Sequence, residues 1–323
     1  MDYSGQRVLV TGGAGFLGAN LCHALAARGA KVVALDGFLF GGGANPANLE
    51  GAGVELVRAD IRETDLRPLC EGATVIFNLA AQTSHMGGQR DPLADIAVNA
   101  VAQVRLIQAA REAAPEAVVV HASTRQFYGK PHYLPVDEKH PVAPPDANGV
   151  SKFAGEQYWM IEHRTAGRPV VSLRLTNCYG PRLRIRDARQ TFLGIWIRCV
   201  LEGRPFEVWG GEQLRDMTYV DDVTDAFLRA AATPACHGQV YNIGGPPPAS
   251  LLEIAELMRK VGGNSVQFTT REFPADRKTI DIGSYHADDA AFRAATGWAP
   301  HVSLEEGIRR SLDWYRSRLA AYL

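Results

Sequence analysis

Short apolar runs alternate with stretches of helical periodicity through the first half of the chain. Short runs that are mostly apolar are typical of strands buried on both faces of a parallel sheet. Residues Pro92 to Ala113 show a long helical pattern. The alternation predicts an α/β fold with a doubly wound parallel sheet, which binds ligands at the carboxyl ends of its strands. The predicted strands are Gln6–Thr11, Lys31–Asp36, Glu55–Ala59, Thr74–Leu79 and Ala117–Ser123.

The pattern changes near residue 180. A helix over Val150–Arg164 and a strand over Val170–Leu175 complete the first part, and we expect the apolar run Val240–Ile243 to return to the sheet. The prediction is a sheet domain over 1–179 with a return segment at about 214–244, and a smaller C-terminal α/β lobe built from 180–213 and 245–323. The elements predicted for this lobe are the helices Phe192–Leu201, Leu251–Val261 and Leu304–Leu319 and the strand Val266–Thr269.

A glycine-rich turn, TGGAGFLG at Thr11–Gly18, joins the first strand to a helix predicted over Ala19–Arg28. Strand, glycine turn and helix in this order bind a dinucleotide pyrophosphate in Rossmann domains. We expect Gly13 to permit the tight turn, Gly15 to let the backbone approach the phosphates, and Gly18 to let the helix pack closely on the strand. The N-terminus of the helix then offers free N–H groups to the anion.

Acidic residues follow the second and third strands. Asp36 lies about 20 residues beyond the glycine turn, as the dinucleotide motif requires. A carboxylate there accepts hydrogen bonds from ribose hydroxyls and repels a 2′-phosphate, which favours NAD over NADP. Asp60 and Ile61 either border the adenine or belong to a solvated loop.

The composition restricts the binding partners and the cellular compartment that we expect for the protein. The chain has 323 residues, 46% of them hydrophobic, and a formal net charge of −1. Nucleic acid and anionic membranes attract a basic excess, so neither is expected as a partner. No apolar run approaches the roughly 18 residues of a membrane helix, and no signal pattern opens the chain. The five cysteines and nine histidines show no metal-ligand spacing, which predicts reduced thiols, a cytoplasmic protein and no metal site.

With these features in view, the chain resembles the extended short-chain dehydrogenase/reductases, in particular their nucleotide-sugar epimerase and dehydratase group. The resemblance covers nearly the whole chain. It implies NAD as cofactor, a nucleotide sugar as substrate, and hydride transfer between the two. The motifs that carry it are TGGAGFLG, Asp36, Asp60-Ile61, Asn78-Leu-Ala-Ala, Asn99, Ser123-Thr124, Tyr128-Gly129, Ser151-Lys152, and the segments 174–182, 211–222, 241–245 and 297–300.

The resemblance also implies a catalytic set, from which one residue departs. Family members place a Tyr-x-x-x-Lys pair on one helix face, and the lysine lowers the pKa of the tyrosine that accepts the sugar proton. By resemblance, Ser123, Thr124 and Lys152 fill the supporting roles. The position four before Lys152 is Asn148. Because a carboxamide transfers no proton near neutral pH, Asn148 is expected to orient substrate or water.

Three interpretations of Asn148 stay open. Another group or a water chain serves as the base, the reaction needs no strong base, or the protein binds its ligands without catalysis. A tyrosine placed at position 148 tests them, because a large rise in turnover would indicate a damaged site. The candidates for a replacement base are Tyr128, His132, Tyr133, His85 and Cys178.

Two further residues differ from the family pattern and restrict the reactions that we expect. Dehydratases of this group place Asp-Glu after the threonine, and uronic-acid decarboxylases keep the glutamate. Here these positions hold Arg125 and Gln126, neither of which is an acid. The prediction is therefore an NAD-dependent epimerase that transiently oxidises a sugar carbinol; the alternatives are a dehydratase or lyase of the same fold and a catalytically silent binding protein. The Arg125 guanidinium either binds a sugar carboxylate or points to solvent.

The resemblance supplies the remaining expectations. The helices that begin at Pro92 and Val150 match a pair that forms a four-helix dimer interface in relatives, so a homodimer is expected. Asn177 and Arg215 match positions that hold a nucleotide diphosphate. The expected cofactor-binding residues are Gly12, Gly15, Phe16, Leu17, Gly18, Asp36, Asp60, Ile61, Leu79, Ala80, Ala81, Asn99 and Lys152. The expected substrate-binding residues are Ser84, Arg125, Asn177, Arg182, Arg215 and Arg277, with Arg189 and Lys278 as further cations.

Overall fold

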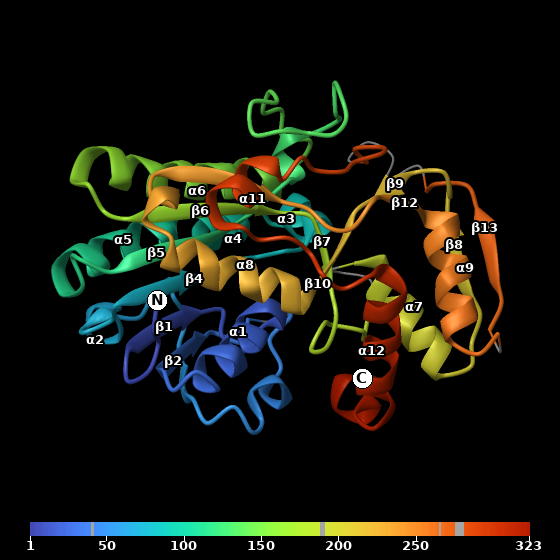
Figure 1. Cartoon of the computed structure of the whole chain (residues 1–323), viewed down its shortest axis with the longest axis horizontal. Helices are drawn as coiled ribbons and strands as arrows, with labels where there is room; N and C mark the ends of the chain where they lie inside the picture. Colours follow the sequence, from blue (N-terminus) through green and yellow to red (C-terminus); the bar gives the residue numbers. More distant parts are fainter. Residues whose placement is uncertain (40–41, 188–190, 265, 275–280) are drawn as a thin grey trace.

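A parallel sheet of seven strands forms the centre of the protein in a computed structural model (Figure 1). The structure describes residues 1–39, 42–187, 191–264, 266–274 and 281–323. The strand order is β11-β6-β5-β4-β1-β2-β3, with every neighbouring pair parallel, which confirms the predicted fold class. The strands are β1 (Arg7–Thr11), β2 (Lys31–Asp36), β3 (Glu55–Arg58), β4 (Val75–Asn78), β5 (Val118–Thr124), β6 (Val170–Leu175) and β11 (Gln239–Ile243).

The strands are apolar because helices cover both faces of the sheet. In β1, Val8 and Val10 belong to the core on one face, and Leu9 belongs to the core on the other. Successive side chains of a strand alternate between faces, so a strand covered on both faces is apolar at most of its positions. The helices on the first face are α1 (Phe16–Ala26), α8 (Val220–Ala232) and α11 (Ala290–Thr296), and those on the second are α2 (Arg67–Cys70), α5 (Ala102–Ala113) and α6 (Ala147–Ala166).

The chain returns to the sheet after a long excursion. β11 pairs with β6, with Val240 opposite Ser172 and Ile243 opposite Leu175. The predicted return of Val240–Ile243 to the sheet is therefore confirmed. Short pairs of strands accompany the excursion: β7 (Asn177–Tyr179) with β10 (Met217–Tyr219), and β9 (Leu214–Arg215) with β12 (Ala249–Ser250).

A second apolar core lies to one side of the sheet, in the right-hand half of Figure 1. Its large buried side chains include Trp196, Phe206 and Tyr315, and Phe16 at the start of α1 joins it to the sheet. Across the residues described above, no helix combines the length and apolar character needed to span a membrane. The elements around this core are α7 (Phe192–Leu201), α9 (Leu251–Val261), α12 (Leu304–Arg316), and β8 (Phe206–Trp209) paired with β13 (Phe268–Arg271).

The predicted long helix over Pro92–Ala113 is not one helix. It divides into α4 (Pro92–Ile96), a π-helical turn (Ala97–Val101) and α5. A π turn adds one residue to a single turn and leaves the periodicity on either side almost unchanged, so the sequence pattern does not reveal it. The wide turn holds Asn99, whose amide oxygen accepts the Gln82 N–H at 2.9 Å.

The ends of several helices also differ from the prediction. α1 begins at Phe16 rather than Ala19, because its first turn contains residues of the glycine motif. α6 begins at Ala147 rather than Val150, because Asp146 caps it by accepting the Gly149 N–H at 2.7 Å. Asn148 therefore lies in the first turn of α6. Further shifts include the C-termini of α1 at Ala26, α6 at Ala166 and α12 at Arg316, and the strand β13 at Phe268–Arg271; several sheet strands differ from the prediction by one residue at an end.

Candidate active site

The carboxyl ends of six sheet strands open onto one cavity. α3 (His85–Arg90) contributes His85 to its wall, and the segment before α7 contributes Leu183 and Thr191. The cavity brings together most residues that the sequence marks as functional. They are Gly12, Gly15, Phe16, Leu17, Gly18, Asp36, Asp60, Ile61, Leu79, Ala80, Ala81, Ser123, Thr124, Arg125, Asn148, Lys152 and Asn177.

The glycine turn after β1 leaves no room for side chains. Gly12 has a left-handed φ of +68°, and a Cβ there would lie 2.8 Å from the carbonyl carbon of Leu79. A Cβ on Gly18 would lie 2.1 Å from Gly12 O. The tight turn therefore depends on Gly12 rather than on Gly13, where the sequence argument placed it. At Gly13 a Cβ is excluded for another reason, since it would lie 2.7 Å from the Ala34 side chain.

This end of the cavity fits a dinucleotide. Gly15 is the N-cap of α1 and has no side chain to bond the N–H groups of the first turn, which stay available to a phosphate. The Asp36 carboxylate is held by the backbone N–H groups of Ala14 and Phe38, at 3.0 and 2.9 Å. Burial raises the pKa of Asp36, and these two hydrogen bonds oppose the rise. Asp36 therefore presents a fixed acceptor where a ribose would lie.

Asp60 also lies on the wall, but its carboxylate is engaged. The Arg62 guanidinium binds both of its oxygens, at 2.6 Å in the shortest contact, and lowers its pKa. The Asp60 side chain is only 18% exposed, so it is not a freely solvated loop acid. Ile61 beside it offers an apolar surface to the same cavity.

Ser123 and Thr124 end β5 with different partners. Ser123 Oγ donates to the buried Glu156 at 2.7 Å and so belongs to a network inside the fold. Thr124 Oγ1 accepts the Gln126 N–H at 3.2 Å. Its hydroxyl hydrogen has no acceptor among the described residues, so Thr124 can donate to an oxygen atom in the cavity.

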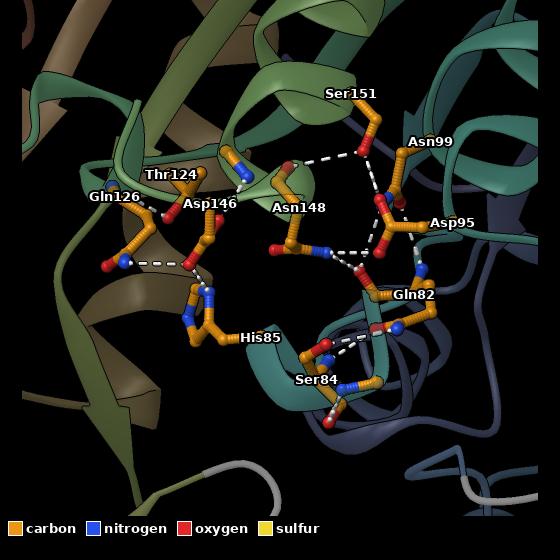
Figure 2. Close-up of polar contacts among 12 residues, drawn as sticks. Gln82, Ser84, His85, Asp95, Asn99, Thr124, Gln126, Asp146, Asn148 and Ser151 are labelled. Atoms are coloured by element: carbon orange, nitrogen blue, oxygen red, sulfur yellow. Dashed lines mark hydrogen bonds and ion pairs between the residues drawn. The ribbon is translucent and has the colours of Figure 1, made fainter. Parts of the chain in front are cut away.

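Asn148 is fully buried, and two acceptors orient its amide (Figure 2). Nδ2 donates to Asp95 Oδ2 at 2.9 Å and to Gln82 O at 3.0 Å. Figure 2 shows Oδ1 directed away from both, toward the side where Asp146 and His85 lie. Oδ1 has no hydrogen-bond partner within the described residues. A buried acceptor left unpaired costs about 1–3 kcal/mol, which a donor on a ligand would recover.

Asp95 joins Asn148 to the neighbouring helices. Its Oδ1 accepts Asn99 Nδ2 at 3.0 Å and also binds the Ser151 hydroxyl. α3 packs tightly here, since a Cβ on Gly88 would lie 2.6 Å from Asp95 Oδ2. Sequence reasoning missed Asp95, although its i, i+4 spacing from Asn99 on a helix was a usable signal.

Lys152 lies one helical turn after Asn148 and lines the cavity. Its Nζ has no hydrogen-bond partner among the described residues. Burial lowers the pKa of Lys152 to about 8, and the charge of Asp95 partly offsets the effect. An ammonium group without an acceptor in this cavity is suited to ribose hydroxyls.

Three candidates for a replacement base lie away from the cavity wall. Tyr128 donates to Asn242 at 2.9 Å and accepts from Arg174 at 2.6 Å, and burial raises its pKa to about 12. Tyr133 is exposed and donates to Asp137, and His132 packs near it on the ring of His140. The geometry gives none of the three access to a ligand in the cavity.

Cys178 and His85 do line the cavity. Burial raises the pKa of the Cys178 thiol to about 12, which leaves it protonated. His85 Nδ1 lies 2.9 Å from Asp146 Oδ2, within ion-pair distance but outside the angular range of a good hydrogen bond. Burial opposes the charge on Asp146, but the His85 contact and the Gly149 N–H outweigh it, so the pKa of Asp146 lies below its ordinary value.

Arg125 is not turned to solvent. Its Nη2 donates to Asn177 Oδ1 at 3.2 Å, and its guanidinium carbon lies 4.7 Å from the centroid of the Tyr285 ring. Nη1 is buried and has no partner among the described residues, and the same is true of Asp216 Oδ1 and Tyr285 Oη. Burial raises the pKa of Asp216 to about 6. Of these three residues, Arg125 is the one that lines the cavity.

Other predicted residues lie outside the cavity wall. Ser84 caps α3 by accepting the Gly87 N–H at 3.0 Å, and Asn99 belongs to the Asp95 network. Arg182 donates to Asn20 Oδ1 at 2.9 Å, and Arg215 donates to two backbone carbonyls. In the part of the chain that is described, no three His, Cys, Asp or Glu side chains gather as a metal site. The predicted cations outside the described residues are Arg189, Arg277 and Lys278.

Known proteins are similar to this chain in sequence and in fold. The model of the NAD dependent epimerase/dehydratase family matches residues 8–244. UDP-glucose 4-epimerase of Mycolicibacterium smegmatis is 35% identical over 97% of this chain and 99% of its own length. The crystal structure of the Thermus thermophilus UDP-glucose 4-epimerase complexed with NAD is 29% identical, with a TM-score of 0.85 over 97% of this chain and 100% of that one. UDP-glucuronic acid 4-epimerase of Bacillus cereus, in complex with UDP-glucuronic acid and NAD, is 28% identical, with a TM-score of 0.84 over 97% and 99%.

Proposed function

The chain belongs to the NAD-dependent epimerase/dehydratase family, and we propose that it is an NAD-dependent epimerase of nucleotide-linked sugars. Membership confirms the resemblance to the extended short-chain dehydrogenase/reductases drawn from the sequence motifs. NAD fits the glycine turn and Asp36 as described above. We propose that residues 1–179 with 214–244 bind this cofactor and that the remaining residues bind the sugar nucleotide.

One observation carries the choice of epimerisation over elimination. Among the described residues that line the cavity, the only carboxylates are Asp36 and Asp60, which follow β2 and β3 at the dinucleotide end. Elimination of water needs an acid for the leaving hydroxyl and a base for the neighbouring carbon. Arg125 and Gln126 stand where such acids would be expected. Epimerisation through a ketone needs one hydride carrier and one site that takes and returns a proton.

The residues around the reacting end support that chemistry. NAD, bound at the glycine turn, would supply the hydride acceptor for the sugar carbon and the hydride donor for the resulting ketone. Thr124 donates a hydrogen bond to the sugar oxygen, and Asn148 Oδ1 accepts one from a neighbouring hydroxyl. The Lys152 ammonium holds ribose hydroxyls of the cofactor. These groups are fixed before the substrate binds, which lowers the entropic cost of reaching the reactive geometry.

We further propose a UDP-sugar as substrate, as in the similar proteins named above. Arg125 lines the cavity beside Asn177, and its Nη1 has no hydrogen-bond partner among the described residues. A planar guanidinium with a free N–H suits a carboxylate, so a uronic acid is the sugar that we favour.

A homodimer belongs to the same proposal. Large apolar side chains are exposed on the two helical segments that the resemblance assigns to a dimer interface. They are Leu93, at 79% exposure, Ile96 and Val101 on one segment and Val150, Tyr158 and Ile161 on the other. Packing two copies together would bury this surface, as in four-helix interfaces. Light scattering should give twice the chain mass of 35.1 kDa, and a single-chain mass for both wild type and Leu93→Glu would refute the dimer.

We place the protein in the cytoplasm. All five of its cysteines are free thiols, as a reducing compartment favours. Fractionation of cells that produce the protein tests this location.

NMR of a UDP-sugar panel in deuterated water, with the NAD-loaded protein, tests the reaction. An epimer without deuterium at the inverted carbon supports the proposal, because the hydride is stored and returned without exchange. Deuterium in an otherwise intact sugar would indicate enolisation, and a dehydrated product would indicate elimination by a lyase. Sugars that bind but remain unchanged would identify a silent binding protein, which is the second candidate because Asn148 replaces the tyrosine.

A further inference from the structure

We propose that His85, oriented by Asp146, takes and returns the sugar hydroxyl proton in place of the family's tyrosine. This inference rests on the proposed epimerase function and names the group that the function lacks. It is carried by the placement of His85, by the fixed position of Asp146, and by the unpaired oxygen of Asn148 beside them (Figure 2).

The side chain of His85 lines the cavity and is not buried in the protein interior. It begins α3 and lines the same cavity as Thr124, Asn148 and Lys152. Its side chain is 37% exposed, so a ligand in the cavity can reach the ring. An imidazole is the side chain best suited to proton transfer near neutral pH.

Asp146 supplies the orienting carboxylate. Its side chain is fully buried, and three groups converge on it: the Gly149 N–H at 2.7 Å, Gln126 Nε2 at 3.2 Å and His85 Nδ1 at 2.9 Å. A carboxylate on Nδ1 favours the tautomer with its hydrogen there, which leaves Nε2 as the basic nitrogen. The same carboxylate stabilises the imidazolium once the proton arrives.

Asn148 completes the arrangement without acting as a base. Its Nδ2 hydrogens are committed to Asp95 and to the Gln82 carbonyl, so its Oδ1 faces the His85 side and is the atom left unpaired. A sugar hydroxyl that donates to Oδ1 would be held beside the imidazole. The residue that replaces the tyrosine therefore positions the substrate for a base that comes from another helix.

The groups named above account for every proton and electron in the proposed reaction. In the oxidation, the sugar C–H bond breaks and its two electrons leave as hydride to NAD⁺, while the hydroxyl O–H bond breaks and its proton passes to His85 Nε2. The C–O bond becomes C=O, and Thr124 donates to the carbonyl oxygen. In the return step, the hydride adds to the opposite face and His85 gives its proton to the oxygen, so no further oxidant or reductant is consumed.

The test compares His85→Ala with His132→Ala, a matched histidine variant outside the cavity wall. For the sugar that wild type turns over, we expect His85→Ala to lower kcat by about 10²- to 10⁴-fold, the usual contribution of a general base. UDP-sugar affinity, measured by calorimetry, should change less than threefold, and His132→Ala should keep wild-type kcat. Added imidazole should restore part of the lost rate to His85→Ala, because the deleted ring leaves a space open to the cavity.

A second variant separates orientation from folding. Asp146→Asn keeps an acceptor for the Gly149 N–H, and we expect it to lower kcat by about 10-fold or more with little effect on UDP-sugar affinity. Full activity of His85→Ala, or a loss that imidazole does not relieve, would overturn the role of His85 and leave the epimerase function standing. A wild type that converts no sugar would overturn the proposed function and this role with it.

Discussion

Replacing Asn148 with tyrosine restores the Tyr-x-x-x-Lys pair of the family, and the structure indicates that this will impair the protein. Asn148 Nδ2 is the donor to Asp95 Oδ2, at 2.9 Å, and one of two donors to Gln82 O. The variant removes both hydrogen bonds. A tyrosine ring directed toward them would meet Asp95, and a ring directed into the cavity would occupy the place of the substrate beside His85.

The size of the effect follows from these contacts. The Asp95 Oδ2 oxygen is left without a donor among the described residues, which costs about 1–3 kcal/mol, and the second lost bond adds about 0.5–1.5 kcal/mol. We therefore expect Asn148→Tyr to lower the free energy of unfolding by about 1.5–4.5 kcal/mol. We also expect it to lower kcat, because the phenol neither replaces the base nor leaves room for the substrate.

Urea unfolding of the NAD-free protein and steady-state turnover of the UDP-sugar measure the two effects. Asn148→Ala is the matched control, since it loses the same two hydrogen bonds without adding a ring. Similar destabilisation of both variants would confirm the role of the amide. A rise in kcat of more than 10-fold in Asn148→Tyr, with unchanged stability, would refute the reasoning and identify a damaged tyrosine site.

Three further predictions follow from individual contacts. Gly18→Ala would place a Cβ 2.1 Å from Gly12 O, so we expect it to abolish NAD binding in calorimetry and to destabilise the fold by at least about 1–3 kcal/mol; a variant that binds NAD normally contradicts the close packing. The pKa of Lys152 is lowered from 10.5 to about 8 by burial. Between these pH values the unfolded chain, in which the lysine stays protonated, therefore binds more protons than the folded protein. The unfolding free energy of wild type should then rise relative to Lys152→Met by about 1–2 kcal/mol as the pH goes from about 8 to 10, and a flat difference in urea unfolding would exclude the shift. Arg125→Met should lower kcat/KM for a UDP-uronic acid about 10- to 100-fold more than for the neutral sugar, and equal losses would assign Arg125 a purely structural role.

The sequence determined the sheet and the dinucleotide end of the site, because both depend on neighbouring residues. The apolar runs of β1, β2 and β4 reflect burial on both faces, a local property of each run. The glycine turn and Asp36 lie within one strand–helix–strand unit, so their spacing along the chain fixes their spacing in the fold. Even here the left-handed position was assigned to Gly13, because composition does not distinguish which of two adjacent glycines has a positive φ.

Only the tertiary structure shows which residues lie together at the end of the cavity where the sugar would react. His85 begins α3, Asp95 lies in α4 and Asp146 caps the N-terminus of α6, and no periodicity relates them along the chain. The sequence named His85 as one of five candidates of equal standing, and only the fold places it in the cavity with a buried carboxylate at 2.9 Å. The absence of a tyrosine at position 148 was visible in the sequence. What stands in its place depends on side-chain directions, which are set by the packing of α3 against α6.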